Sequence, residues 1–115
     1  MFRFENLEIW RSACDVGDAL CEIAASLDER RLYRFAEQLR AAALSISNNI
    51  AEGSGSTSNP EFRNFLNYSR RSIFECASMV AFFARKQYIK LEQKDELLAE
   101  LDLLSRKITS FSRTL

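Results

Sequence analysis

Residues 58–83 read SNPEFRNFLNYSRRSIFECASMVAFF, and this stretch carries the clearest structural signal in the chain. Ser58 or Asn59 can accept a hydrogen bond from a free main-chain N–H at a helix start, and Pro60 suits the first turn because its φ angle is already helical. Glu61 adds a negative charge near the positive end of the helix dipole. Together these residues predict a helix that begins near Asn59 and continues to about Lys86.

The same stretch has a regular apolar pattern. At about 100° per residue, one set of side chains falls within roughly 100° of arc and defines a core-facing side. This set is Phe62, Phe65, Leu66, Ser69, Ile73, Cys76, Val80 and Phe83. Phe74 and Phe82 instead project about 140° from the centre of that face. Two large rings are therefore predicted to lie outside the core of a single chain.

Three more segments repeat apolar residues every three or four positions, as amphipathic helices do. They span residues 5–27, 32–52 and 92–112. The first has a main stripe and a second stripe along its edge. The main stripe is Leu7, Trp10, Ala13, Cys14, Gly17, Leu20, Cys21 and Ala24, and the second is Ile9, Val16 and Ile23. The core face of residues 32–52 is Leu32, Phe35, Ala36, Leu39, Ala42, Ala43, Ile46 and Ile50. The core face of residues 92–112 is Leu97, Leu98, Leu101, Leu104, Ile108 and Phe111.

Four helices of about 20 residues, each roughly 30 Å long, fit an antiparallel up-and-down four-helix bundle. The fold class is therefore predicted to be all-α, with residues 1–115 as a single domain. The chain has only 3 Gly and 1 Pro, which suits long helices and disfavours a turn-rich β fold. Gly53 is expected just beyond the second helix, where glycine often ends a helix, and residues 53–58 are expected to form a flexible loop.

The composition narrows the classes of function. The formal net charge is zero, so no global charge attracts nucleic acid or acidic membranes. Histidine is absent, which removes the usual general base and the commonest zinc ligand. Cys14, Cys21 and Cys76 form no CxxC pattern and are expected to be small buried apolar residues. No secretion signal or membrane-spanning stretch is evident, so a cytoplasmic protein is expected. No cofactor or metal is expected either, because the sequence contains no complete set of ligand residues.

The charges are unevenly distributed along the chain. Residues 1–30 carry 3 basic and 7 acidic side chains, whereas residues 59–90 carry 6 basic and 2 acidic side chains. The acidic first part is expected to pair with the basic third part, either within one chain or between chains.

Residues 38–53 read QLRAAALSISNNIAEG. This run resembles the signature of the bacterial 23S rRNA intervening-sequence protein family, which looks like Q-L-R-R-A-x-x-S-I-P-x-N-I-A-E-G. Further similarities lie at Phe4, Leu7 and Trp10, at residues 61–66, at residues 72–75 and at residues 87–89, so the resemblance covers nearly the whole chain. The Asn-Ile-Ala-Glu-Gly run, residues 49–53, is its most specific part.

The resemblance implies an up-and-down bundle that assembles into a ring-like homopentamer. It also implies an association with nucleic acid by analogy, because a related accessory protein of diversity-generating retroelements engages nucleic acid and a reverse transcriptase. The chain departs from the family pattern in its basic residues. Ala41 and Ser56 stand where basic residues are usual, Ser47 replaces a customary Pro, and Arg71 replaces a common Gly.

Two polar groups are candidate sites. The first lies in the family motif and consists of Gln38, Arg40, Ser45, Asn49, Glu52 and Gly53. It is interpreted either as a ligand or partner site or as a hydrogen-bond network that links helices or subunits. The second consists of Arg63, Arg70, Arg71, Arg85 and Lys86 on the third helix, with Asn67 among them. It is interpreted either as a set of phosphate contacts or as a solvated, salt-bridged face.

Apolar residues outside the expected core favour assembly. They recur on three helices and form the predicted oligomer interface: Ile9, Val16, Ile23, Tyr33, Leu44, Phe74 and Phe82. The sequence therefore predicts a non-enzymatic homo-oligomer of scaffold or protein-interaction type, with copies of itself and another protein as partners. The alternative is an RNA- or DNA-associated accessory protein that binds phosphates through basic residues of the third helix.

Overall fold

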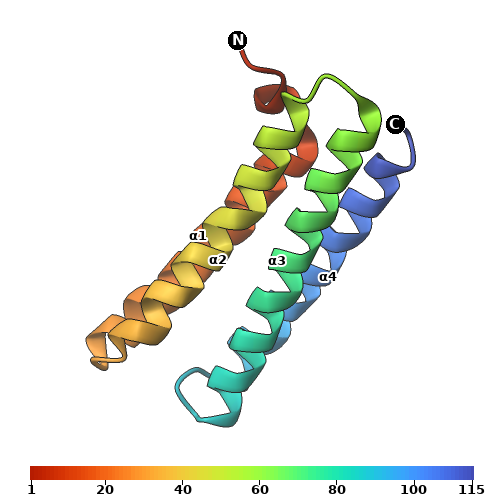
Figure 1. Cartoon of the computed structure of the whole chain (residues 1–115). Helices are drawn as coiled ribbons and strands as arrows, with labels where there is room; N and C mark the ends of the chain where they lie inside the picture. The colour runs from red at the N-terminus through yellow and green to blue at the C-terminus, as the bar shows by residue number, and fades with distance from the viewer.

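The computed structural model describes residues 1–115 and contains four long helices and no strand. A short 3₁₀ helix, η1 (Arg3–Asn6), precedes α1 (Glu8–Glu29), α2 (Tyr33–Ser54), α3 (Asn59–Arg85) and α4 (Leu91–Ser112). The helices run alternately up and down in an elongated bundle of 44 × 22 × 19 Å (Figure 1). The all-α bundle predicted from the sequence is confirmed, and the helix limits differ from the predicted ones by at most three residues.

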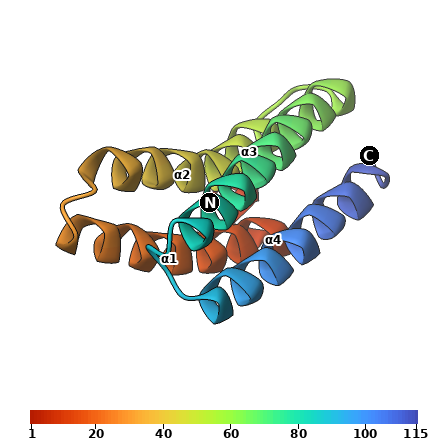
Figure 2. The same ribbon diagram turned by 90° about the horizontal axis from the view of Figure 1, so that it is seen from below.

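Consecutive helices pack against each other, α1 also packs against α4, and the diagonal pairs do not meet. Seen from one end of the bundle, α2 and α3 lie along one side while α1 and α4 lie along the other (Figure 2). The α1–α2 side of the bundle is therefore opposite the α3–α4 side. None of the helices has an apolar stretch long enough to cross a membrane.

The start of α3 agrees with its sequence signal. Ser58 is the N-cap residue, and its Oγ accepts a hydrogen bond from the main-chain N–H of Glu61 at 3.3 Å. Pro60 lies in the first turn, where its missing N–H leaves no helical hydrogen bond unmade.

The turns that follow α1 and α3 share one geometry. At each turn a residue with positive φ follows the helix: Arg31 at 62° and Gln87 at 61°. The next N–H then donates back to a carbonyl in the last turn, from Leu32 to Leu27 and from Tyr88 to Phe83, both at 2.9 Å. This is the hydrogen-bond pattern of a Schellman motif, with non-glycine residues in the left-handed position.

These two turns lie at the same end of the bundle (Figure 1), and the side chain of Arg30 connects them. The Arg30 Nη1 donates to the main-chain oxygen of Gln87 at 3.2 Å. The guanidinium carbon of Arg30 lies 5.1 Å from the centre of the Tyr88 ring, within the range of a cation–π contact. One arginine therefore joins the α1–α2 hairpin to the α3–α4 hairpin.

The core corrects the prediction for α1. Ile9, Val16 and Ile23 were expected at a subunit interface, yet they are 4–6% exposed and belong to the core of the single chain. The physical reason is that α1 has two neighbours. Ile9 and Val16 line the contact with α4, so the second stripe packs against a helix of the same chain.

The small residues of α1 were also misplaced. Cys14 and Gly17 are only half-buried and Cys21 is exposed, so these positions of the predicted main stripe lie at the edge of the core. Of the three cysteines, only Cys76 is buried as expected. The predicted faces of α2, α3 and α4 agree with the observed core in most positions.

Candidate functional site

The motif residues Ser45 and Asn49 lie where α2 packs against α3. The Asn49 Nδ2 donates to the main-chain oxygen of Ser45 at 2.8 Å and to its Oγ at 3.1 Å. From α3, the Ser72 Oγ donates to the Ser45 Oγ at 2.9 Å, and the buried Ser69 Oγ donates to the main-chain oxygen of Ile46 at 2.8 Å. Three serine side chains thus connect the two helices within an otherwise apolar contact, and Asn49 holds Ser45 in place from the same helix.

Gly53 explains why the two helices can approach so closely near this network. The sequence predicts Gly53 beyond the helix end, but α2 continues to Ser54 and its C-cap residue is Gly55. No glycine in the chain has a positive φ angle, so a turn does not require this one. A Cβ at Gly53 would lie 2.8 Å from both the Phe62 Cδ1 and the Phe65 Cβ. Glycine is needed here because any side chain would push α3 away. We call the contact formed by Ser45, Asn49, Gly53, Ser69 and Ser72 the α2–α3 seam.

A polar groove lies along the outer edge of this seam. Its volume is about 540 Å³, and it is lined by Ser45, Asn49, Tyr68, Arg71, Ser72 and Glu75. The groove offers hydroxyl, amide, guanidinium and carboxylate groups. The hydroxyls of Ser45 and Ser72 are bonded to each other, and the Asn49 amide to Ser45, so the central groups of the groove are engaged in holding the helices together.

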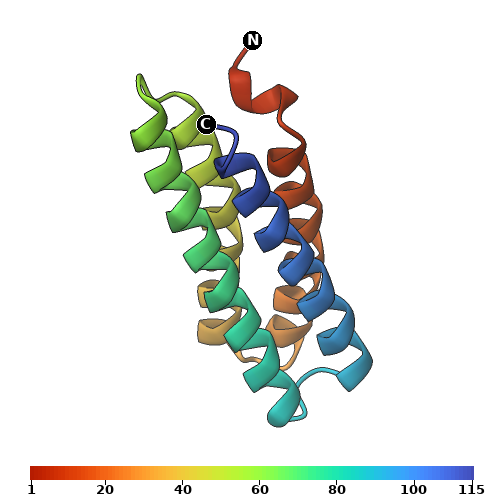
Figure 3. The ribbon, with the colours of Figure 1, turned by 90° about the vertical axis from the view of Figure 1, so that its right-hand side faces the viewer.

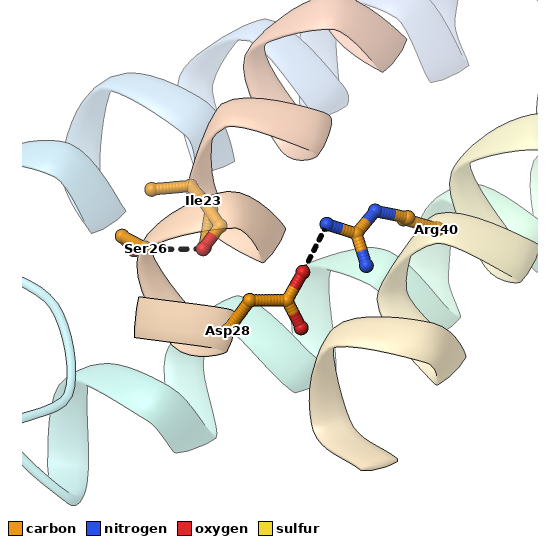
Figure 4. Close-up of polar contacts among 4 residues, drawn as sticks. All are labelled: Ile23, Ser26, Asp28 and Arg40. Atoms are coloured by element: carbon orange, nitrogen blue, oxygen red, sulfur yellow. Dashed lines mark hydrogen bonds and ion pairs between the residues drawn. The ribbon is translucent and has the colours of Figure 1, made fainter. Parts of the chain in front are cut away.

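The fold separates the remaining motif residues. Arg40 lies on the α1 side of α2, where its Nη2 is hydrogen-bonded to the Asp28 carboxylate (Figure 4). That hydrogen bond is the main reason why the pKa of Arg40 is raised. Gln38 and Glu52 are exposed, and their side chains make no hydrogen bond within the chain. The structure therefore brings together Ser45, Asn49 and Gly53 and leaves Gln38, Arg40 and Glu52 apart from them.

The predicted basic band on α3 is divided in the same way. Arg63 and Arg70 line a groove between α3 and α4, whereas Arg71 lines the polar groove between α2 and α3. Arg85 is the last residue of α3, and Lys86 is its C-cap residue at the far end of the helix. These five residues do not form one continuous surface. Sequence reasoning missed Arg113, which joins Arg63 and Arg70 from α4; its position opposite α3 follows only from the packing of the two helices.

The cysteines differ in their surroundings. Burial raises the pKa of the Cys76 thiol to about 12, and the nearby Glu75 carboxylate adds to this effect. Burial also raises the pKa of Cys14, with smaller contributions from Asp18 and Asp15. No group of three or more Cys, Asp and Glu side chains is arranged to hold a metal ion.

Comparisons with known proteins agree with the fold and with the motif. A structure of a protein of unknown function from the S23 ribosomal protein family of Bacteroides thetaiotaomicron VPI-5482 superimposes with a TM-score of 0.85. The match covers 90% of this chain and 97% of that chain at 19% sequence identity, so it supports the shared fold alone. No significant match is found among curated proteins. The family model for the 23S rRNA-intervening sequence protein matches residues 5–110. The chain therefore belongs to the 23S rRNA-intervening sequence protein family.

Proposed function

We propose that this chain is a non-enzymatic protein-interaction module that assembles with copies of itself into a closed ring. The observation that carries the proposal is the exposure of large apolar side chains on opposite sides of the bundle. Leu44 is 60% exposed and Phe74 is 63% exposed in the single chain. Burying one such side chain is worth about 1.5–3 kcal/mol, which favours association when several are covered.

Leu44 belongs to a shallow groove between α1 and α2. The groove has a volume of about 190 Å³, and its apolar part consists of small residues and Leu44. We call it the α1–α2 face, defined by Ala13, Cys14, Gly17, Ala43 and Leu44. An added Cβ at Gly17 would have no atom within 4 Å, so this glycine leaves open space on the surface. Such a face fits a protruding apolar side chain from a partner.

Phe74 lies on the other side of the molecule. It follows Asn67 by seven residues and Arg70 by four, so the three share one side of α3, and the latter two line the groove against α4. We call this side the α3–α4 face. Phe82 and Tyr33 are also about half exposed, but the Phe82 ring lies 6.2 Å from the Phe35 ring and is therefore partly covered from α2.

Two different faces on opposite sides favour a ring over a two-fold dimer. A symmetric dimer uses the same patch on both copies, whereas contacts between unlike faces produce rings when the rotation closes. Charge supports this arrangement. The α1–α2 groove contains Asp18, which forms no ion pair within the chain, and Arg40, which is paired with Asp28. The α3–α4 groove contains three arginines, and none of the four ion pairs within the chain joins α1 to α3. A ring of five copies follows from the family resemblance.

The test uses two variants, Leu44→Glu and Phe74→Glu, with light scattering after size exclusion. Each variant alone is expected to lose the ring, because ring formation would bury an unpaired glutamate on one face of every copy. When the two are mixed, the intact Phe74 face of one can meet the intact Leu44 face of the other, and a heterodimer is expected. Leu91→Glu is the matched control, because Leu91 is 65% exposed at the start of α4 and lies on neither face.

The outcomes are distinct. A wild-type chain that is monomeric at micromolar concentration would refute assembly. A ring that survives both substitutions would place the interface elsewhere. Variants that dissociate but do not pair on mixing would indicate that each face contacts its own copy rather than the other face.

The alternative function, an RNA- or DNA-associated accessory protein, predicts binding that weakens steeply with salt because phosphate contacts release counterions. Arg63 and Arg70 are the two predicted contacts that share one groove. Anisotropy measurements with a labelled RNA at several salt concentrations test this alternative, and salt-independent assembly without RNA binding would reject it.

A further inference from the structure

A second groove, between α3 and α4, is lined by an unusual concentration of arginine. Its volume is about 130 Å³, and its polar lining consists of Arg63, Asn67, Arg70, Thr109, Ser112 and Arg113. Arg63, Asn67 and Arg70 lie at successive spacings of four and three on one side of α3. Ser112 and Arg113 follow Thr109 by three and four residues, at the end of α4 and at its C-cap. Two helices thus direct three positive charges toward one small space.

No acidic side chain in the groove neutralises these charges. No Asp or Glu lines it, and none of its three arginines takes part in an ion pair within the chain. Of the three guanidinium groups, only that of Arg63 donates a hydrogen bond within the chain, from Nη1 to the main-chain oxygen of Leu115 at 2.9 Å. One turn before the groove, by contrast, Arg106 is paired with Asp102 at 3.1 Å.

Arg70 provides the most specific evidence. Its Nε is buried but has no hydrogen-bond partner, and it is one of only two such side-chain atoms in the molecule. A buried donor without an acceptor destabilises a protein, and the penalty is larger when the group is charged. An acceptor placed in the groove would remove this penalty. Mutual repulsion among the three guanidinium groups favours an acceptor with negative charge.

The other polar groups of the groove narrow the kind of anion. The amide of Asn67 and the hydroxyl of Ser112 have no partner within the chain, whereas the Thr109 hydroxyl already donates to the main-chain oxygen of Ser105 at 3.1 Å. Unused donors therefore come from α3 and α4 at once. A tetrahedral oxyanion has acceptor oxygens on all sides, and arginine forks match phosphate oxygens in pairs.

We propose that the α3–α4 groove binds a phosphate group, held by Arg63, Arg70 and Arg113 with help from Asn67 and Ser112. The phosphate is either a free monoester or one phosphodiester of a nucleic acid, since both present the same oxygens to the groove. The evidence for this site does not rest on the proposed ring, but the groove shares Asn67 and Arg70 with the α3–α4 face, so a bound phosphate and a neighbouring copy would compete for the same side chains. The site also differs from a general basic face, because Arg71, Arg85 and Lys86 take no part in it.

The experiment titrates the full chain with inorganic phosphate and follows amide and arginine Nε–H signals by nuclear magnetic resonance at constant ionic strength. Saturable shifts are expected for Asn67, Arg70, Ser112 and Arg113. Arg70→Gln should weaken binding about tenfold or more, because it removes a charged hydrogen bond. Arg113→Gln is a second variant, in which the buried Nε of Arg70 is retained.

Arg34→Gln is the matched control. Arg34 is exposed on α2, forms no ion pair, and its replacement changes the net charge by the same amount. Its phosphate affinity should equal that of the unaltered chain. Circular dichroism and size exclusion of every variant verify that helices and assembly are retained.

Two further titrations identify the source of the phosphate. A nucleoside monophosphate that binds through Arg70 while a short RNA does not would assign a free monoester, and Arg70-dependent RNA binding would assign a phosphodiester. The proposal is overturned if inorganic phosphate gives no saturable shifts or if Arg34→Gln weakens binding as much as Arg70→Gln. It is also overturned if Arg70→Gln dissociates the assembly without affecting phosphate, because Arg70 would then pair with a carboxylate of a second copy.

Discussion

The α2–α3 seam and the contact between α1 and α4 show two ways in which the same bundle holds its helices. The α2–α3 seam is closely packed, with Gly53 against two phenylalanines and a hydrogen bond between Ser72 and Ser45. The contact between α1 and α4 is the least extensive of the four (Figure 3). It leaves two grooves of about 420 and 290 Å³, and Leu103 remains 54% exposed beside both. We call this second contact the α1–α4 seam.

The difference shows what the family motif does physically. Asn49 and Gly53, the first and last residues of the most specific part of the motif, lie in the α2–α3 seam. The α1–α4 seam is crossed by one surface ion pair, Lys107 with Glu8 at 3.2 Å. Asn49 and Gly53, which belong to the family motif, therefore have a structural role: they hold α2 close to α3. Four predictions test this contrast.

The largest effect is expected at alkaline pH. Cys76 follows Ser72 by one turn, on the same side of α3, and its pKa is raised from 9.0 to about 12. Because the folded pKa is higher than the unfolded one, stabilisation is complete below pH 9 and is lost as the pH rises toward 12. Complete titration would remove roughly 4 kcal/mol, since each pKa unit corresponds to about 1.4 kcal/mol. Denaturant unfolding at increasing pH measures the loss, and Cys76→Ala should lessen it. If the free energy of unfolding fell as steeply with pH in that variant, Cys76 would not be the cause of the loss.

The next effect compares two glycines that lie within helices, Gly53 in the last turn of α2 and Gly17 in the middle of α1. Gly53→Ala should lower the free energy of unfolding by about 2 kcal/mol, because the added Cβ overlaps with Phe62 and Phe65. Gly17→Ala should raise it by about 0.5–1 kcal/mol, because alanine favours a helix and the space there is open. Urea unfolding of both variants gives the two values. The same sign for both would mean that Gly53 is not required by close packing.

A smaller effect is expected from the hydrogen bonds of the seam. Asn49→Ala should lower the free energy of unfolding by about 1 kcal/mol, because the two contacts to Ser45 are lost. Gln38→Ala is the control on the same helix, since its exposed side chain makes no hydrogen bond, and a change within about 0.5 kcal/mol is expected. Equal values for both would remove Asn49 from the structural network.

The smallest effect is expected in the α1–α4 seam. Lys107→Ala removes the ion pair with Glu8, whose carboxylate side chain is largely exposed. Exposed pairs contribute about 0.2–1 kcal/mol, and salt screens them, so the effect should approach zero at high ionic strength. Unfolding at low and high salt measures it. A salt-independent loss as large as that of Gly53→Ala would show that the α1–α4 seam is not the weaker contact.

The helices were predictable because their signals are local. The cap at Ser58 and the apolar spacing of residues 62–83 depend only on neighbours in sequence, and both agree with the structure. The interface stripe on α1 was predicted wrongly because periodicity cannot tell which partner a face meets. The second stripe, Ile9, Val16 and Ile23, lies outside the main apolar stripe of α1. It is nevertheless buried within the chain, because a helix in a bundle has apolar contacts with two neighbours.

The candidate sites were predicted only in part for a related reason. The pairing of Ser45 with Asn49 follows from their spacing of four residues, but the participation of Ser72 requires the register of α2 against α3. Gly53 carried a clear signal whose usual interpretation, a helix end, was wrong here. Arg113 carried no signal, because its role depends on the side of α4 that faces Arg63 and Arg70.

The contact between Arg30 and Gln87 has a consequence for the order of folding. Each hairpin can form from contacts between adjacent helices, whereas this hydrogen bond joins residues 57 positions apart. Contacts over long stretches of chain form slowly because the loop must first be closed. We therefore expect Arg30 to engage after the folding barrier, so that Arg30→Ala accelerates unfolding and leaves the folding rate nearly unchanged. Stopped-flow measurements that showed slower folding instead would mean that the two hairpins meet at the barrier itself.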